Sequence, residues 1–350
     1  MKLASAERIL DIQPIEGADK IVKAQVLGWW IVVKKDEFKI GDLVSYIQID
    51  TVVPEESQYE FLRERSYRVR TIKLRKQISQ GLIVPLPPGK YKEGDDLTSI
   101  LKITKFSKEI PDEPIKAPKI WYKKYIWLFK QRILFKLFPN LNKPSKLPFP
   151  TNEVPKTDEE RIQNIPTTLT KYRGKQFVIS EKLDGSSITI LYNHKGKNKY
   201  RICSRNYEMN NINNEWSKTF IDTKFSQHIN ELVKFFKTNN IIVQGELIGK
   251  PQGNLYKVEN QIRLFNIYVD GKRISQHDFD TVTKILSIPA VPVIMKLPLE
   301  FESIEQILLY AEGKSKLNEN TEREGLVFRD FENTISFKVI SNKFLIKNNE

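Results

Sequence analysis

Residues 176–193, QFVISEKLDGSSITILYN, contain two apolar runs rich in β-branched and aromatic residues, separated by Lys-Leu-Asp-Gly. This pattern predicts two strands joined by a short turn. Lys182 ends the first strand, and Asp184 follows two residues later. A lysine becomes nucleophilic when burial or neighbouring cations lower its pKa, and an aspartate is a good ligand for a divalent metal ion. Gly185 lets the backbone approach a ligand closely, although these residues alone also fit an ordinary turn.

The sequence around this stretch predicts an α+β domain with antiparallel sheets over residues 151–350. Residues 226–240, SQHINELVKFFKTNN, have the spacing of an amphipathic helix. Apolar runs with strand character follow at 241–249, 262–271, 324–330 and 335–340.

The first 105 residues predict a separate small β-barrel. Runs at 21–35, 42–54 and 66–87 are rich in β-branched and aromatic residues, and Gly17, Gly41, Pro54 and the Pro88-Gly89 pair separate them. Several short strands without intervening helices favour an antiparallel barrel of the OB or SH3-like kind.

A basic linker is expected between the two domains, over residues 106–150. From Pro114 to Pro150 the chain has nine lysines and arginines, no acidic residue and six prolines. Residues 121–138, WYKKYIWLFKQRILFKLF, are compatible with a helix on a bilayer or on nucleic acid. Because the charges spread around the helical wheel, we favour a helix packed between the domains, with the lysine stems lying along apolar surface.

The overall composition favours a polyanionic partner. The 57 lysines and arginines exceed the 43 acidic residues, which gives a net charge of +14. A single cysteine, Cys203, and three scattered histidines exclude an internal disulfide and a structural zinc site. The N-terminus lacks the apolar core of a signal peptide. Together with the single cysteine, this favours a reducing, cytoplasmic compartment and no membrane partner. We also expect the protein to be a monomer.

Six segments in order resemble motifs of the covalent nucleotidyltransferase superfamily, which contains polynucleotide ligases and mRNA capping enzymes. The resemblance is greatest to the ATP-dependent RNA ligases. The segments are EKLDGSS (181–187), CSRN (203–206), VQGELIG (243–249), RLFNIYV (263–269), EGLVFRD (324–330) and SFKVISNKF (336–344).

The resemblance implies a role for each of these motif residues. Lys182 takes the AMP, Lys338 contacts the α-phosphate, Arg205 contacts the ribose or the terminal nucleotide, Phe265 stacks on adenine, and Glu181 belongs to the same nucleotide site. Asp184 and Glu324 hold a hydrated Mg²⁺ or Mn²⁺ ion, and Glu246 contacts the ribose or a metal-bound water. The run PKTDEERIQN (155–164) resembles the segment before the lysine motif, with Arg161 near the β- and γ-phosphates.

Physical arguments support these roles. Lys338 supplies a second cation, which lowers the pKa of Lys182 and neutralises charge in the transition state. Mg²⁺ prefers few direct protein ligands, which suits the pair Asp184 and Glu324. One departure from the family pattern is Ile340, where many ligases have a second lysine; Lys343, Lys347 or an upstream residue is then the candidate for that phosphate contact.

The domain order favours one branch of the superfamily. The chain ends twelve residues after Lys338, so no C-terminal OB domain of the DNA ligase or capping enzyme kind is expected. Residues 18–54 instead resemble the N-terminal OB module of RNA ligases that seal nicks in duplexes. The basic residues Arg68, Arg70, Lys73, Arg75 and Lys76 are then expected to line a nucleic-acid surface, or else to protect a solvated edge strand.

The resemblance therefore implies an ATP-dependent RNA ligase that joins 3′-hydroxyl and 5′-phosphate ends. Its expected partners are ATP and nicked double-stranded RNA or RNA/DNA hybrid, with RNA on the 3′-hydroxyl side. The alternatives are a DNA ligase, a capping-type guanylyltransferase, or an inactive nucleic-acid-binding module. The intact Lys182, Asp184, Glu246, Glu324 and Lys338 argue against the last of these.

Overall fold

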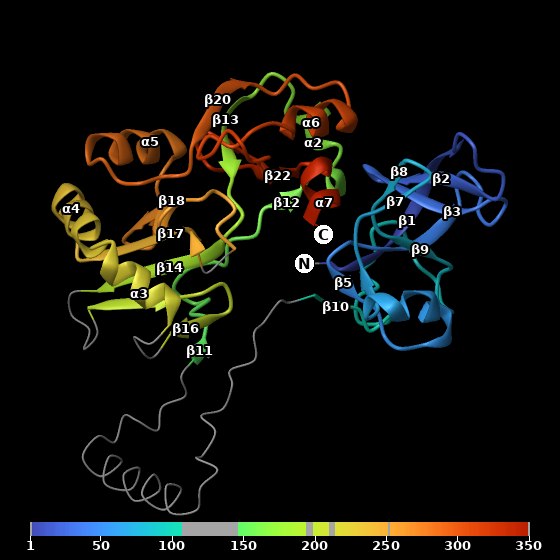
Figure 1. The fold of residues 1–350 in the computed structure, drawn as a ribbon, viewed down its shortest axis with the longest axis horizontal. Helices are drawn as coiled ribbons and strands as arrows, with labels where there is room; N and C mark the ends of the chain where they lie inside the picture. Colours follow the sequence, from blue (N-terminus) through green and yellow to red (C-terminus); the bar gives the residue numbers. More distant parts are fainter. Residues whose placement is uncertain (1, 107–145, 194–198, 210–213, 251–252, 349–350) are drawn as a thin grey trace, which may run out of the picture.

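The computed structural model describes residues 2–106, 146–193, 199–209, 214–250 and 253–348. Figure 1 shows two bodies, an N-terminal one made of strands and a larger C-terminal one, with the last helix lying between them. The helix expected at 121–138 lies outside the described residues. Across the described ranges, no helix is both long and apolar enough to cross a membrane.

The N-terminal body is a strongly curved barrel. Its five-stranded sheet has the order β3-β2-β1-β4-β9, formed by β1 (Ala4–Pro14), β2 (Ile21–Val26), β3 (Trp29–Lys34), β4 (Leu43–Ile47) and β9 (Leu82–Val84). The long β1 pairs with β4 through its first half and with β2 through its second half, with an irregularity between Ile9 and Asp11. The Gln80 N–H donates to the Trp30 carbonyl across 3.0 Å, which brings the two edges of the sheet together.

Shorter elements complete this body. They are β5 (Thr51–Val52), the 3₁₀ helix η1 (Ser57–Arg65), β6 (Arg68–Val69), the hairpin β7 (Ile72–Leu74) and β8 (Gln77–Ser79), and β10 (Thr104–Lys105). The interior is filled by large side chains, among them Trp29, Tyr46 and Tyr59, each exposed by 1% or less. The barrel therefore has its own hydrophobic core.

The C-terminal body contains a seven-stranded antiparallel sheet with the order β11-β16-β15-β14-β17-β18-β19. Its strands are β11 (Lys146–Pro148), β14 (Ser186–Asn193), β15 (Tyr200–Cys203), β16 (Tyr207–Met209), β17 (Asn240–Ile248), β18 (Gln261–Val269) and β19 (Lys272–Arg273). Strand β11 pairs with β16, so Lys146–Pro148, which we assigned to the linker, belong to this sheet. Proline does not prevent this pairing, because β11 is at the edge of the sheet and Pro148 is its last residue. A proline is tolerated there although it has no N–H to donate.

A second sheet in this body has the order β12-β22-β21-β13-β20. It consists of β12 (Glu160–Arg161), β13 (Gln176–Lys182), β20 (Val293–Pro298), β21 (Gly325–Asp330) and β22 (Ser336–Ile340). The expected strands 176–182 and 186–193 therefore belong to different sheets, and the Lys-Leu-Asp-Gly segment is the connection between them.

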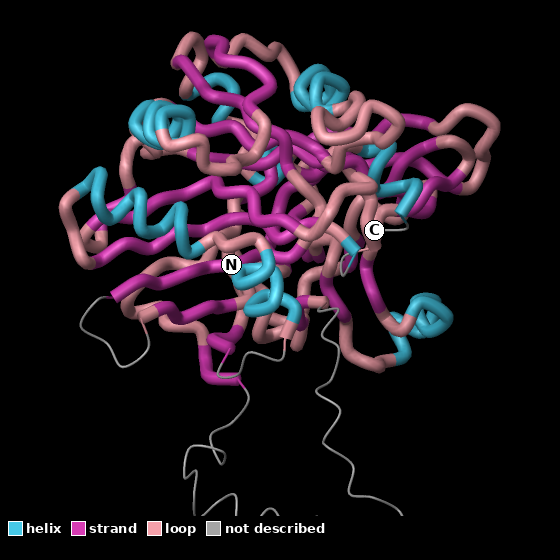
Figure 2. Tube along the Cα trace, turned by 60° about the vertical axis from the view of Figure 1, so that its left-hand side comes forward, coloured by secondary structure: helices cyan, strands magenta, loops and turns pink. Residues whose placement is uncertain are grey.

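Most of the helices of this body lie on the outside of these sheets, as Figure 2 shows, whereas the last helix lies between the two bodies. The helices are α2 (Thr168–Lys171), α3 (Glu215–Asp222), α4 (Ser226–Phe236), α5 (Gln276–Ile285), α6 (Ile304–Ala311) and α7 (Asn342–Asn348), with the 3₁₀ turn η3 (Ile162–Asn164). Asn214, Ser275 and Ser303 cap α3, α5 and α6 by accepting a backbone N–H from three residues ahead. The predicted helix at 226–240 is confirmed as α4, which ends at Phe236 with Lys237 in the left-handed conformation.

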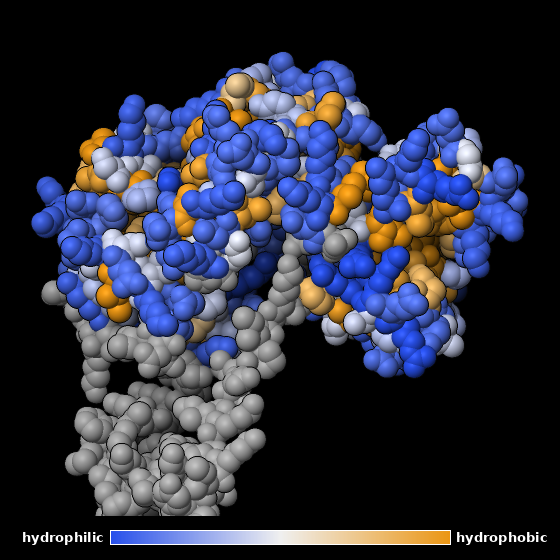
Figure 3. All heavy atoms as spheres, in the orientation of Figure 1, coloured by the Kyte–Doolittle hydropathy of each residue, from blue (hydrophilic) through white to orange (hydrophobic). Residues whose placement is uncertain are grey.

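The two bodies share part of one core. Ile340 and Leu345 from the C-terminal body are 2% exposed and pack within the N-terminal hydrophobic cluster. The Gly28 N–H donates to the Gln163 carbonyl across 2.8 Å, and the Trp29 indole donates to Asn164 across 2.7 Å. A side chain at position 28 would begin 2.8 Å from the Gln163 backbone, so glycine permits this close approach. Figure 3 shows hydrophilic side chains around the hollow where the bodies meet.

Candidate active site

The central group of the candidate site is the Lys182 ammonium. Lys182 is the last residue of β13, and its Nζ donates to Glu324 Oε1 across 2.6 Å. The register explains this contact, because Lys182 is paired with Gly325, the residue after Glu324. Gly325 cannot be replaced easily, since a Cβ there would lie 2.2 Å from the Val339 carbonyl oxygen. The lysine and glutamate motifs, 142 residues apart, are thus joined by one strand pair.

The connection from β13 to β14 brings in two further carboxylates. Asp184 is held there by its backbone N–H, which donates to the Tyr256 hydroxyl across 2.6 Å. Glu246 lies on β17, where it is paired with Ser187 of β14. A Cβ on Gly185 would lie 2.5 Å from the Leu247 carbonyl oxygen. We expected Gly185 to admit a ligand, but the structure shows that it admits the neighbouring strand β17.

These carboxylates control the protonation of Lys182. Burial alone would lower the Lys182 pKa, but the negative charges of Glu324, Glu246 and Asp184 raise it above its ordinary value. The sequence-based expectation of a lowered Lys182 pKa is not met in this structure. Lys338 does not reverse the effect, because three carboxylates lie around the ammonium. These charges therefore favour the protonated form of Lys182, and compensation of some of the negative charge would favour the neutral amine.

The same cluster carries more negative charge than one lysine neutralises. Burial, with the negative charges of Glu324 and Asp184, outweighs the lowering effect of Lys182 and raises the Glu246 pKa to about 8. Glu324 Oε2 is buried without a hydrogen-bond partner. Within the described ranges, no three acidic, histidine or cysteine side chains lie close enough to bind a bare metal ion by themselves. The excess charge and the orphaned oxygen nevertheless fit a hydrated divalent cation, which needs few direct protein ligands.

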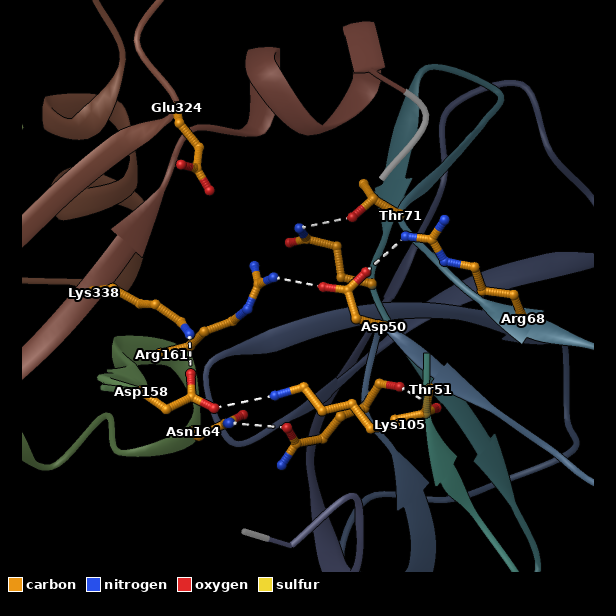
Figure 4. Close-up of polar contacts among 12 residues, drawn as sticks. Asp50, Thr51, Arg68, Thr71, Lys105, Asp158, Arg161, Asn164, Glu324 and Lys338 are labelled. Carbon is orange, nitrogen blue, oxygen red and sulfur yellow. Dashed lines mark hydrogen bonds and ion pairs between the residues drawn. The ribbon is translucent and has the colours of Figure 1, made fainter. Parts of the chain in front are cut away.

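A group of cations gathers around Asp158, and one of them, Lys338, feels the charge of Lys182. Lys338 of β22 contacts Asp158 Oδ1 at 3.0 Å, and Arg205 contacts Asp158 Oδ2 at 2.8 Å. Lys105 of the N-terminal body contacts the same Oδ2 at 3.1 Å, as Figure 4 shows for two of these contacts. Burial is the largest cause that lowers the Lys338 pKa, and the charges of Arg161 and Lys182 act in the same direction. The structure therefore brings Lys182, Arg205 and Lys338 together, as the resemblance implies.

Two of the expected basic residues, Arg161 and Arg68, lie at the interface between the two bodies. Arg161 of β12 donates to Asp50 across 2.9 Å, and Arg68 pairs with the other oxygen of Asp50 at 3.0 Å.

The expected substitutes for a second lysine at position 340 can also be located. Ile340 itself is buried in the shared core, and Lys343 is 66% exposed and paired with Glu312 at 2.7 Å. Upstream residues, rather than Lys343, are thus the ones that lie beside Lys338.

Phe265 lies at an irregularity of the β17–β18 pairing, where Asn266 faces Gln244 and Leu264 faces Gly245. The extra residue of such a bulge is turned relative to its neighbours. The Arg329 guanidinium lies 5.4 Å from the centre of the Phe265 ring, and Arg329 also donates to the Phe265 carbonyl. Arg329 therefore fixes the position of the Phe265 ring from one side.

Glu181 does not accompany Lys182 into the site. Adjacent residues of a strand point to opposite faces, and Glu181 is 1% exposed, with Oε2 accepting the Lys316 N–H across 2.8 Å. This contact anchors the loop before Glu324. The structure thus gives the Glu181 side chain a supporting role, and the expected contact of this residue with the nucleotide stays a prediction.

Sequence analysis missed Asp158, Lys105 and Tyr256. Asp158 begins the charged run 158–161, which leads into strand β12 and is a local signal for it. Lys105 and Tyr256 carry no local signal, since each reaches the site only through the tertiary fold.

The expected basic surface of the N-terminal body is present in part. Lys73, Arg75 and Lys76 are exposed on the β7–β8 hairpin. Arg68 is not part of this surface, because it pairs with Asp50 and its guanidinium lies 3.8 Å from the centre of the Phe106 ring.

Known proteins provide an independent comparison. A family model described as an OB-fold domain matches residues 3–86, and an RNA ligase family model matches residues 175–347. The solved structure of Naegleria gruberi RNA ligase with PPi is 33% identical, has a TM-score of 0.81, and the match covers 100% of this chain and 99% of that chain. The chain belongs to the RNA ligase family.

Two other structures of the Naegleria gruberi enzyme give the same result. A mutant with ATP and Mn is 33% identical with a TM-score of 0.79 and covers 98% of each chain; a mutant with AMP and Mn has the same identity and TM-score and covers 99% of this chain and 98% of that chain. A search of curated proteins finds no match. The predicted family, and the predicted combination of an N-terminal OB fold with an α+β ligase domain, are confirmed.

Proposed function

We propose that this RNA ligase uses ATP and a divalent cation to join a 3′-hydroxyl to a 5′-phosphate at nicks in duplexes. The observation that carries the proposal is the position of Lys182. Three carboxylates suited to a hydrated cation act on its ammonium, and Lys338, which is close enough to feel its charge, shares Asp158 with Arg205 in a set of cations suited to phosphates. Related structures with ATP, AMP and Mn support the choice of cofactors.

The chemistry follows from this placement. Deprotonated Lys182 Nζ attacks the α-phosphorus of ATP, the bond to the β-phosphate bridging oxygen breaks, and pyrophosphate leaves. Lys338 and Arg205 orient the α-phosphate and neutralise its developing charge. Asp184, Glu246 and Glu324 would hold the cation, whose charge favours the neutral amine over the ammonium. AMP then passes from Lys182 to the 5′-phosphate end, and the 3′-hydroxyl displaces AMP.

The N-terminal body supports the assignment of a duplex substrate. Its exposed basic hairpin projects Lys73, Arg75 and Lys76, and the chain carries a net charge of +14. Arg75 and Lys76 both have positive φ, at 47° and 67°, a conformation that non-glycine residues adopt rarely. The hairpin turn therefore presents two cations in a fixed geometry, which suits the phosphate backbone of a duplex.

Four nicked duplexes test this proposal. They differ only in whether each strand that flanks the nick is RNA or DNA. A site that reads A-form shape and the 2′-hydroxyl should seal the nicks with RNA on the 3′-hydroxyl side and discriminate less on the 5′-phosphate side. Equal sealing of the all-DNA nick would contradict the proposal and favour the DNA ligase alternative. Transfer of GMP in place of AMP would favour a capping-type guanylyltransferase.

A further inference from the structure

Asp158 forms ion pairs with three separate cations at this site. Its Oδ1 accepts from Lys338 at 3.0 Å, and its Oδ2 contacts Arg205 at 2.8 Å and Lys105 at 3.1 Å. The three cations come from β22, from the turn between β15 and β16, and from β10 of the other body. A carboxylate needs one such partner for a structural ion pair. Three partners from three segments instead form an anion-binding site, and the Asp158 carboxylate is the anion that fills it.

The cations around Asp158 are also the ones that our proposed function assigns to phosphates. Carboxylate and phosphate oxygens are interchangeable ligands for lysine and arginine. Lys338 and Arg205 cannot give their full hydrogen-bonding capacity to Asp158 and to a bound phosphate together. We propose that the Asp158 carboxylate occupies a phosphate position of the nucleotide site, and that incoming phosphate groups displace it. This inference rests on the proposed function, and it adds a competing residue that the reaction must move.

The surroundings of Asp158 allow such a displacement without unfolding the segment. The neighbours are fixed independently, because Glu159 pairs with Arg329 at 2.6 Å and Arg161 pairs with Asp50 at 2.9 Å. Strand β12 begins at Glu160, so Asp158 lies just before the strand. Its side chain is 26% exposed, which leaves it a path to solvent. Rotation of one side chain is sufficient to free the three cations.

An internal competitor has a consequence for selectivity. The Asp158 carboxylate keeps the three cations near one another before a ligand arrives. A monovalent anion carries no more charge than this carboxylate and so has no electrostatic advantage over it. A polyphosphate carries several negative charges and does have this advantage. Asp158 would therefore weaken the binding of every anion but raise the preference for highly charged ones.

The test is the binding of inorganic pyrophosphate to the full chain, measured by calorimetry at low salt. We expect Asp158→Asn to bind pyrophosphate about tenfold more tightly than the unchanged protein, because the competing charge is gone while the amide keeps the side-chain shape. Acetate should gain by a larger factor, so that the preference for pyrophosphate over acetate falls. In single-turnover adenylylation, the ATP concentration that gives half the maximal rate should fall, with a smaller change in the maximal rate.

Asp280→Asn is the matched control. Asp280 also lies in an ion pair, with Lys296 at 2.7 Å, but on α5, and the substitution makes the same change in net charge. It should leave pyrophosphate affinity unchanged within about twofold. Thermal unfolding of both variants establishes that they fold.

Two results would overturn the inference. Unchanged affinity in Asp158→Asn would show that the carboxylate does not occupy a phosphate position, and weaker affinity would show that it organises the cations without competing. Adenylylation of the unchanged protein separates this inference from the proposed function. A protein that forms lysyl-AMP while Asp158→Asn binds pyrophosphate no better refutes the competitor alone, and a protein that forms no adduct refutes the proposed function.

Discussion

Replacing Glu246 with glutamine should make the fold less sensitive to high pH. The Glu246 pKa is about 8 in the folded protein, compared with 4.5 for an ordinary glutamate, first because of burial and also because of the negative charges of Glu324 and Asp184. The folded state therefore retains a proton that the unfolded chain loses between pH 4.5 and 8. The contribution of Glu246 to the free energy of unfolding is therefore fully present below pH 4.5 and is lost as the pH rises through 8.

The magnitude follows from the difference between the two pKa values. A difference of about 3.5 pH units corresponds to at most about 5 kcal/mol. Water entry and movement of the Lys182 ammonium reduce this, so we expect on the order of 2 kcal/mol. Glutamine cannot ionise and carries no such pH dependence.

The assay is urea unfolding at pH 5 and pH 9 with a chelator present, since a bound cation would hide the effect. The unchanged protein should lose about 2 kcal/mol more stability over this range than Glu246→Gln. Glu16→Gln, on the exposed surface, should behave like the unchanged protein. Parallel pH profiles for Glu246→Gln and the unchanged protein would refute the proposed crowding of negative charge at Lys182.

Three further predictions follow from the contacts. Lys338→Ala should slow lysine adenylylation at least about 100-fold, as for loss of a strong electrostatic contact, whereas the exposed Lys343→Ala should change it little; equal losses in single-turnover rates would make Lys343 a phosphate ligand. Ile340→Ala should cost about 2–5 kcal/mol in chemical unfolding, and because Ile340 lies in the N-terminal core, an N-terminal probe should report the loss; a loss confined to the C-terminal body would contradict the shared core. Nick binding should weaken steeply from low to moderate salt, and adenylylation should weaken much less; equal salt sensitivity would mean that the basic surface serves the nucleotide site.

Local sequence patterns predicted the strands, because burial and alternation are properties of each segment. The apolar runs around Lys182, Glu246 and Glu324 form β13, β17 and β21. The Lys-x-Asp-Gly pattern also predicted that Lys182 ends a strand and that Asp184 follows it. The resemblance then identified which distant segments belong to the same site, and the register Lys182 with Gly325 brings two of them together.

The features that sequence did not predict depend on long-range contacts. Asp158 gains its importance only because Lys105, Arg205 and Lys338 converge on it. The raised pKa of Lys182 depends on three carboxylates from three segments, and a motif gives their presence but not their net effect. The contact of the Glu181 side chain with the Lys316 N–H is also long-range, although strand alternation alone places this side chain opposite that of Lys182.

The central claim, that Lys182 carries AMP between ATP and RNA, is tested most directly by intact-protein mass spectrometry. Incubation with ATP and Mg²⁺ should add the mass of one AMP to the unchanged protein and none to Lys182→Ala, and GTP should give no adduct with either protein. Lys316→Ala provides a control, because Lys316 contacts Glu181 through its backbone and its side chain has no assigned role. An adduct of unchanged size in Lys182→Ala, or labelling by GTP in preference to ATP, would contradict the account.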